Sequence, residues 1–299
     1  MRSLGPKRLL WVDIDGRDPD TLEHVVGLLG LSDAELKTLS SDDGRARLTR
    51  SENMLHVTLE AIETDDAVPP KFFRREMDLL VSPNIVLSVH DGRLNALRRF
   101  RDGLGGETRL GSLTAADLMS ALIDEVLVGY FLLAEIVQRQ IDDLDERALR
   151  GRPGDDILAA IVELRHRIGL IRRVLAPHRD AFSTLGLPEM GVAETLGRPW
   201  PGLVDRLEAA MTAIDGLRTG LLGTFDIHMG RVSQRANDVM RALTLLSAIL
   251  LPSVVLAGIM GMNFKLGFFD ETTNFWFVLG GMGILAATLL TVAKLRHWW

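Results

Sequence analysis

The sequence contains no cysteine among its 299 residues, although hydrophobic residues make up 47% of the chain. The absence of cysteine excludes disulfide bonds, cysteine-ligated zinc sites and thiol-based catalysis. The chain also lacks the GxSxG, phosphate-loop and HExxH patterns of common enzyme families. No basic stripe interleaved with aromatic residues is present, and the formal net charge is −6. We therefore expect neither an enzyme nor a nucleic-acid-binding protein, and no bound cofactor.

Charged residues are also scarce in the last quarter of the chain. Residues 242–262 and 274–293 carry no charge, and each run is about twenty residues long, enough to cross the roughly 30 Å hydrocarbon layer of a bilayer. A buried helix of a soluble protein passes the same test, but two such runs in succession favour two transmembrane helices. Because only residues 263–273 connect them, we expect the two helices to be antiparallel neighbours.

Basic residues flank the two apolar runs on the same side of the membrane. They are Arg231, Arg235, Arg241, Lys294, Arg296 and His297. The connecting loop carries Lys265 together with Asp270 and Glu271. This distribution predicts that both termini are cytoplasmic and that the loop lies outside. Since the first residues do not resemble a secretory signal, we expect a multi-pass protein of the bacterial inner membrane.

Residues 1–110 alternate strand and helix patterns and are predicted to form a cytoplasmic α/β subdomain. Strands are predicted at 8–14, 54–63, 78–81 and 85–90. Helices are predicted at 18–29 and 32–39, the second with Ser32 as its cap. The predicted fold class is therefore an α/β cytoplasmic domain followed by a long stalk helix and two C-terminal transmembrane helices.

Residues 111–201 are predicted to form long antiparallel helices of the cytoplasmic domain. Thr114 and Asp117 form a capping-box pattern, and apolar residues then recur every three or four positions. This stripe consists of Leu118, Leu122, Val126, Tyr130, Leu133, Val137, Ile141 and Leu144. A second helix is predicted at 155–185, and we expect Pro177 to kink it.

A third long helix is predicted to begin near Gly202. No proline occurs from there to Pro252, so a stalk helix over 202–241 should continue directly into the first membrane helix. Residues 294–299 are left as a cytoplasmic tail after the second membrane helix.

The motif Gly261-Met262-Asn263 stands at the end of the first apolar run and is followed by Phe264. Further residues match the same known pattern at the same spacing, namely Asn237, Met240, Leu243, Thr244, Pro252 and Gly258. In these residues the chain resembles the CorA-type magnesium transporter family. The resemblance implies a funnel-shaped homopentamer in the lipid bilayer that transports Mg²⁺, with Co²⁺ and Ni²⁺ as further divalent cations. Two helices cannot enclose a pore, which independently requires several copies of the chain.

The resemblance also implies roles for individual residues. Gly261, Met262 and Asn263 would form the selectivity filter, and Asn237 and Thr244 would form polar rings in the pore. Apolar constrictions would come from Met240, Leu243, Ala248 and Leu251. Because Mg²⁺ holds its waters tightly, neutral oxygens that hydrogen-bond those waters suit its passage. The alternatives are that Asn263 only caps the helix, that Asn237 is an ordinary exposed residue, and that the apolar residues serve helix packing.

Acidic residues elsewhere in the chain are weaker indications of cation sites than the Gly261-Met262-Asn263 motif. Asp270 and Glu271 in the loop would attract cations, whereas Lys265 stands where the family commonly has an acidic residue and would repel them. Asp205 and Glu208, near the start of the stalk helix, are the candidates for a regulatory metal site. The histidines at 166, 178 and 228 lack the i, i+4 pairing of a zinc site and are predicted at the surface or in helix contacts.

Two alternative functions stay open at this point. One is zinc transport, possessed by a related branch and in some cases coupled to protons; Lys265 favours it and the intact Gly261-Met262-Asn263 does not. The other is a membrane-anchored oligomeric assembly or signalling protein that transports nothing. An Asn263→Ala variant separates this last function from conduction, since only a channel should respond to it.

Overall fold

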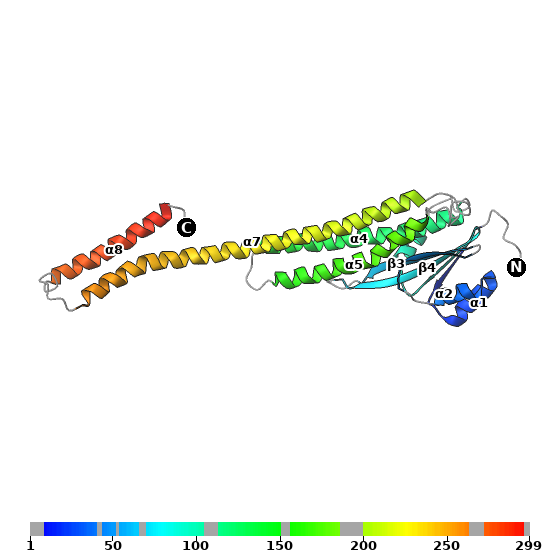
Figure 1. Ribbon diagram of the computed structural model, residues 1–299, viewed down its shortest axis with the longest axis horizontal. Helices are drawn as coiled ribbons and strands as arrows, with labels where there is room; N and C mark the ends of the chain where they lie inside the picture. The colour runs from blue at the N-terminus through cyan, green and yellow to red at the C-terminus, as the bar shows by residue number, and fades with distance from the viewer. Residues whose placement is uncertain are drawn as a thin grey trace. The chain divides into compact units, whose positions relative to one another are not determined.

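The computed structural model describes residues 9–40, 44–51, 54–65, 70–104, 113–150, 156–185, 200–262 and 272–295. The chain divides into two compact units, Met1–Phe225 and Asp226–Trp299. The first unit is an α/β structure, and the second consists of apolar helices (Figure 1). The helix α7 (Trp200–Met260) is continuous and contributes residues to both units.

The first unit is built on a sheet with the strand order β1-β5-β4-β3-β2. β1 pairs with β5 in parallel, and the other neighbours are antiparallel. The strands are β1 (Leu10–Asp15), β2 (Arg47–Ser51), β3 (Met54–Thr64), β4 (Phe72–Val81) and β5 (Ile85–His90). Four of them overlap the predicted strands. β2 was not predicted, and β4 begins six residues before the predicted start at residue 78.

Two short helices cover one face of this sheet, and long helices cover the other (Figure 1). α1 (Pro19–Leu29) begins at Asp18, whose carboxylate accepts a hydrogen bond from the Thr21 amide at 3.0 Å. α2 (Asp33–Ser40) follows, with Ser32 and Glu35 hydrogen-bonded to each other as a cap. The core beneath the two helices consists of Ile14, Leu22, Val26, Leu39, Leu80, Leu87 and Val89.

The other face of the sheet packs against α4 (Ala115–Arg150) and α5 (Ile157–Leu185), with α3 (Asn95–Leu104) packed beside α4. The predicted capping box is confirmed, because the Thr114 and Asp117 amides each bond to the other residue's side chain. All eight residues of the predicted apolar stripe on α4 are buried. Pro177 lies inside α5 and does not end it.

α7 changes its surroundings part of the way along its length. Up to Thr224 it contributes a buried row to the first unit, consisting of Leu203, Leu207, Ala210, Ile214, Leu217, Leu221 and Thr224. Ion pairs also join it to α4 and α5, with Arg206 at 2.9 Å from Asp124 and Arg172 at 2.9 Å from Asp215. From Phe225 to Met260 none of its residues is buried.

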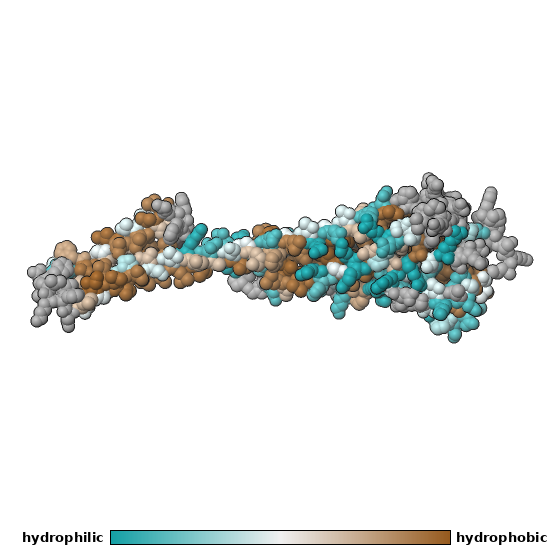
Figure 2. Space-filling model, viewed as in Figure 1, coloured by the Kyte–Doolittle hydropathy of each residue, from teal (hydrophilic) through white to brown (hydrophobic). Residues whose placement is uncertain are grey.

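α7 and α8 (Thr272–Leu295) are both long and apolar enough to cross a membrane. Their most apolar windows have mean hydropathies of 2.3 and 2.0 and are 0% buried in the chain. Hydrophobic side chains therefore cover the surface of the second unit (Figure 2). A core helix of a soluble protein would bury such a window, so the predicted fold class with two C-terminal apolar helices is confirmed.

Candidate functional site

The predicted pore residues lie on the part of α7 where every side chain is at least partly exposed. Asn237, Met240, Thr244, Ala248 and Leu251 follow each other at steps of three or four residues. This spacing places them on one side of the helix, here called the 237–251 stripe. Met240 is 66% exposed and Leu251 is 68% exposed. The structure therefore brings these five residues together on an open helix face.

Leu243 lies on a different face of α7. It belongs to a row with steps that alternate strictly between three and four residues, here called the heptad face. The row consists of Met229, Val232, Ala236, Val239, Leu243, Leu246 and Leu250. All of these side chains are exposed in the single chain. Since Leu243 directly precedes Thr244, the heptad face lies about 100° around the helix from the 237–251 stripe.

The heptad face has the pattern of a coiled-coil seam, in which apolar residues repeat every seven positions as two sets. The sequence contained this signal, but of this row only Leu243 was assigned a role, as an apolar constriction with helix packing as the alternative. The exposure of the whole row distinguishes it from the buried row that α7 contributes to the first unit.

Hydroxyl groups on the membrane part of α7 bond back to the helix. Thr244 Oγ1 donates to the Met240 carbonyl at 2.8 Å, and Ser253 Oγ donates to the Ile249 carbonyl at 3.1 Å. The Thr244 proton is therefore used inside the helix, while the oxygen keeps lone pairs that can accept. Thr244 thus offers an acceptor on the 237–251 stripe, which suits the protons of water bound to a cation.

Gly261 and Met262, the described part of the Gly261-Met262-Asn263 motif, directly follow the last residue of α7, Met260. The Gly261 amide donates to the Ala257 carbonyl at 2.9 Å, and the Met262 amide donates to the Ile259 carbonyl at 3.2 Å. The last carbonyls of a helix have no intrahelical donor, so this end presents acceptor oxygens. Asn263, Lys265, Asp270 and Glu271 lie outside the described residues.

The two candidates for a regulatory metal site lie in the first unit. Asp205 is exposed on α7, and Glu208 forms an ion pair with Arg179 at 2.7 Å. Across the part of the chain that the structure describes, no group of three or more His, Asp or Glu residues is arranged to hold a metal ion. A regulatory site at Asp205 and Glu208 therefore stays a prediction that a single chain does not test.

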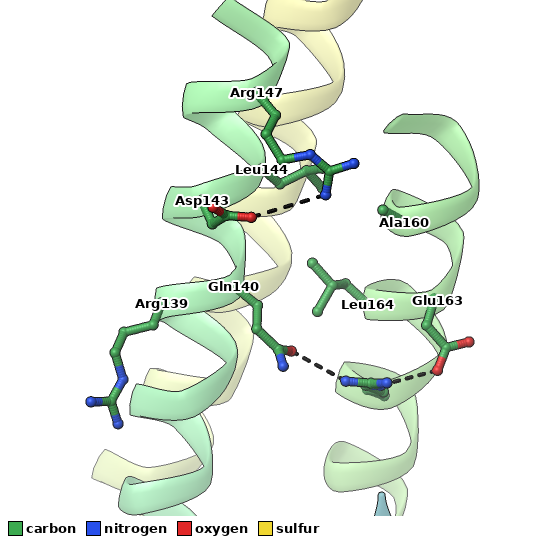
Figure 3. Close-up of a pocket in the computed structure, with 9 residues that line it drawn as sticks. Arg139, Gln140, Asp143, Leu144, Arg147, Ala160, Glu163 and Leu164 are labelled. Atoms are coloured by element: carbon green, nitrogen blue, oxygen red, sulfur yellow. Dashed lines mark hydrogen bonds and ion pairs between the residues drawn. The ribbon is translucent and has the colours of Figure 1, made fainter. Parts of the chain in front are cut away.

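A hollow of about 380 Å³ lies between α4 and α5, and Figure 3 shows its lining. Its acidic residues are already paired with arginines: Asp143 lies 3.9 Å from Arg147, and Glu163 lies 3.0 Å from Arg167. Arg167 also donates to Gln140 at 3.3 Å. Because each carboxylate has a guanidinium beside it, the hollow is not suited to a divalent cation.

A buried charge cluster that the sequence did not reveal lies on the opposite face of the sheet. Asp78 accepts from Thr58 and lies 2.7 Å from both His56 and Arg17. Burial raises the pKa of the Asp78 carboxyl, but the hydrogen bond and charge of His56, with Thr58 and Arg17, outweigh it and lower the pKa below its usual value. Arg17 also pairs with Glu76 at 2.8 Å. The cluster pairs its acids with bases and is a structural link between β3, β4 and the end of β1.

His178 is buried in a contact between α5 and α4, the second of the two places predicted for it. Its Nε2 accepts a hydrogen bond from the Glu60 amide of β3 at 3.0 Å, and its Nδ1 lies 3.1 Å from the Leu175 carbonyl. Complete burial lowers the pKa of His178 to about 4. The residue therefore joins α5 to the sheet as a neutral imidazole and takes no part in a metal site.

Comparison with known proteins covers nearly the whole chain. The sequence profile of the family described as CorA-like Mg²⁺ transporter protein matches residues 6–295. The chain is 24% identical over 295 residues to the cobalt/magnesium transport protein CorA of Thermotoga maritima, with 96% of this chain and 83% of that protein covered. It is also 24% identical over 269 residues to the zinc transport protein ZntB of Photorhabdus laumondii, with 86% and 78% covered.

Two full-length solved structures share the fold. The CorA magnesium transporter from Methanocaldococcus jannaschii matches with a TM-score of 0.76 at 18% identity, covering 99% of this chain and 93% of that one. The full-length CmaX protein matches with a TM-score of 0.69 at 22% identity, covering 100% and 91%. The match thus includes the α/β unit, the long helix and the apolar helices together.

Proposed function

Because the chain belongs to the CorA-like Mg²⁺ transporter family, we propose that it transports divalent cations across a membrane, with Mg²⁺ as the main ion and Co²⁺ and Ni²⁺ as further substrates. The observation that carries the proposal is the second half of α7. This helix has an exposed stripe with Asn237 and Thr244, is apolar enough to cross a bilayer, and ends directly before Gly261 and Met262. No enzymatic activity is included in the proposal.

Transport requires several copies of the chain, because the two apolar helices of one chain cannot surround a passage. The heptad face supplies a surface on which copies of α7 can pack side by side. The 237–251 stripe then lies next to this seam and is left to line the passage. A homopentamer is the assembly that the family resemblance implies.

The chemistry of the stripe suits a cation that keeps its water. Mg²⁺ dehydrates reluctantly, so its bound waters, rather than the ion, meet the protein. These waters donate hydrogen bonds, and the Asn237 amide oxygen, Thr244 Oγ1 and the carbonyls at Gly261 can accept them. Asn263 would complete the selectivity filter with Gly261 and Met262. Met240, Ala248 and Leu251 would supply apolar constrictions suited to gating by dewetting. Leu243, which lies on the heptad face, would instead pack between copies of α7.

The orientation follows from the flanking charges. Residues 1–110, 111–201 and 202–241 would form the cytoplasmic subdomain, its long helices and the stalk. Residues 242–262 and 274–293 would cross the bacterial inner membrane, with 263–273 outside and 294–299 in the cytosol. Asp270 and Glu271 would then attract cations at the outer mouth, while Asp205 and Glu208 would face the cytosolic Mg²⁺ pool.

Zinc transport is a second candidate, and one observation favours it. The chain is 24% identical to the zinc transport protein ZntB over 269 residues, the same identity as to the cobalt/magnesium transport protein CorA over the longer stretch of 295 residues. Lys265 in the loop points in the same direction, because it departs from the acidic residue that the CorA-type family commonly has at this place.

Ion flux into liposomes that contain the purified protein tests the proposal. Mg²⁺, Co²⁺, Ni²⁺ and Zn²⁺ are measured side by side, with and without a proton gradient, for the wild type and Asn263→Ala. We expect Mg²⁺ uptake that the substitution alters. Zinc uptake alone, increased by the proton gradient, would replace Mg²⁺ transport by zinc transport. An assembled oligomer without any flux would contradict transport altogether and favour an assembly or signalling role.

A further inference from the structure

Pro252 interrupts the hydrogen-bond ladder of α7 within the apolar segment. In an α-helix the amide of each residue bonds to the carbonyl four positions earlier. Pro252 has no N–H, so the amide that would bond to the Ala248 carbonyl does not exist. Inside a bilayer such a carbonyl needs another partner, because hydrocarbon offers no donor.

The hydroxyl groups of Ser253 and Thr244 do not replace the missing donor. Ser253, directly after the proline, gives its proton to the Ile249 carbonyl at 3.1 Å. Thr244, four residues before Ala248, gives its proton to the Met240 carbonyl at 2.8 Å. These two protons are thus engaged at the Ile249 carbonyl, one position from Ala248, and at the Met240 carbonyl, about two turns from Ala248.

Ala248 lies on the 237–251 stripe, the same side of α7 as Asn237 and Thr244. Beyond Thr244, the residues that continue this side of the helix are Ser247 at its edge and then Ala248, Leu251, Val255 and Gly258. None of the residues beyond Ser247 has a polar side chain. Ser247 and Gly261 are separated by a helical rise of about 21 Å. An apolar passage of that length sheds water and blocks a hydrated ion.

We propose that the Ala248 backbone carbonyl, left open by Pro252, is an inner binding step for hydrated Mg²⁺ between Thr244 and Gly261. This inference rests on the proposed function and names one more group in its pathway. Each copy of α7 in the assembly contributes one carbonyl at the same height. The carbonyl accepts a hydrogen bond from a water of the ion and leaves the ion's coordination shell intact. No bond to the ion itself is formed or broken.

A pair of variants separates the open carbonyl from the proline ring. Pro252→Ala restores the N–H and with it the ladder bond to Ala248. The matched control is the ester form of Pro252→Ala, in which oxygen replaces this N–H, so that the ring is absent and the carbonyl stays open. Both proteins are first checked for an unchanged oligomer mass in detergent.

We expect Pro252→Ala to lower Mg²⁺ flux into liposomes by about fivefold, the effect of raising a barrier by one hydrogen bond, while the ester keeps wild-type flux. Wild-type flux in Pro252→Ala would overturn the inference, and so would an equal loss in both variants, which would assign the effect to the ring. These outcomes are distinct from a wild type without flux, which contradicts the proposed function itself.

An infrared measurement tests the carbonyl without relying on flux. The Ala248 carbonyl is labelled with ¹³C and ¹⁸O, and its amide I band is recorded with and without Mg²⁺ in the full-length protein in bilayers. The inference requires a band that shifts to lower frequency when Mg²⁺ is added to the wild type and stays fixed in Pro252→Ala. A wild-type band whose frequency does not change when Mg²⁺ is added would overturn the inference.

Discussion

Tyr130 of α4 and His178 of α5 meet edge to face, with ring centroids 6.1 Å apart, and both bind the backbone of Glu60. The Tyr130 hydroxyl donates to the Glu60 carbonyl at 2.6 Å, and His178 Nε2 accepts from the Glu60 amide at 3.0 Å. One residue of β3 thereby anchors two long helices. The folded state therefore requires the neutral imidazole, because a proton on His178 Nε2 would face the Glu60 N–H and the hydrogen bond would be lost.

This anchor predicts a loss of stability at mildly acidic pH. The pKa of His178 lies near 4 in the folded chain, against 6.5 for an ordinary histidine. The unfolded state therefore binds more protons over this interval, and the free energy of unfolding falls as pH drops through it, by about 2 kcal/mol between about pH 6.5 and pH 5. Hydrogen exchange of the β3 amides in the full-length protein measures the change.

The matched control for this prediction is the exposed His166, twelve residues earlier on α5. His178→Gln should remove most of the pH dependence between these limits, because glutamine can accept the hydrogen bond but does not titrate. His166→Gln should leave it unchanged. A wild type with the same β3 protection at both pH values would show that His178 does not control this equilibrium.

Removal of Arg17 should destabilise the first unit strongly. The side chain is 10% exposed and pairs with Asp78 and Glu76, whose side chains are 1% and 8% exposed. Arg17→Ala would leave buried carboxylates without a cation, at a cost of about 3–5 kcal/mol. Arg172→Ala breaks an ion pair whose two side chains are about half exposed, and the expected cost is below about 1 kcal/mol. Thermal unfolding of the two full-length variants in detergent gives the comparison, and equal midpoints would contradict it.

If copies of α7 pack through the heptad face, a charge introduced on this face should dissociate the assembly. Val232→Asp places a charge on this face in every copy and forfeits the burial of a valine, about 1.5–3 kcal/mol per chain. Gln234→Asp introduces the same charge about 200° around the helix. Light scattering in detergent should show a smaller particle for Val232→Asp and the wild-type mass for Gln234→Asp. An intact assembly with Val232→Asp would mean that copies of α7 meet through another face.

Local periodicity explains which parts of the fold the sequence predicts well. The stripe of α4 and its capping box depend on residues three or four positions apart, so both are visible without knowledge of the tertiary structure. β2 was missed because Arg47–Ser51 contains a single apolar residue, Leu48. Its strand conformation comes from pairing with β3, a contact that is not encoded within the segment.

In the candidate site, too, the sequence reveals local spacing but not contacts between distant residues. Sequence spacing alone places Asn237 and Thr244 on one side of α7, and the structure adds only that this side is open. The charge cluster of Arg17, His56 and Asp78 was not predictable, because sheet pairing and the turn after β1 bring together residues up to 61 positions apart. Sequence reasoning considered Leu243 with the constrictions, although the alternation of three- and four-residue steps already linked it to the heptad face.

The position of α7 in both units has a consequence for the synthesis of the protein. Chains fold from the N-terminal side as they leave the ribosome. The last residues that α7 buries in the first unit, Leu221 and Thr224, leave the ribosome shortly before the apolar residues that must be inserted into the membrane. Completion of the α/β unit and insertion of the first apolar helix therefore fall close together in time, and slow packing around Leu221 would coincide with the moment of insertion.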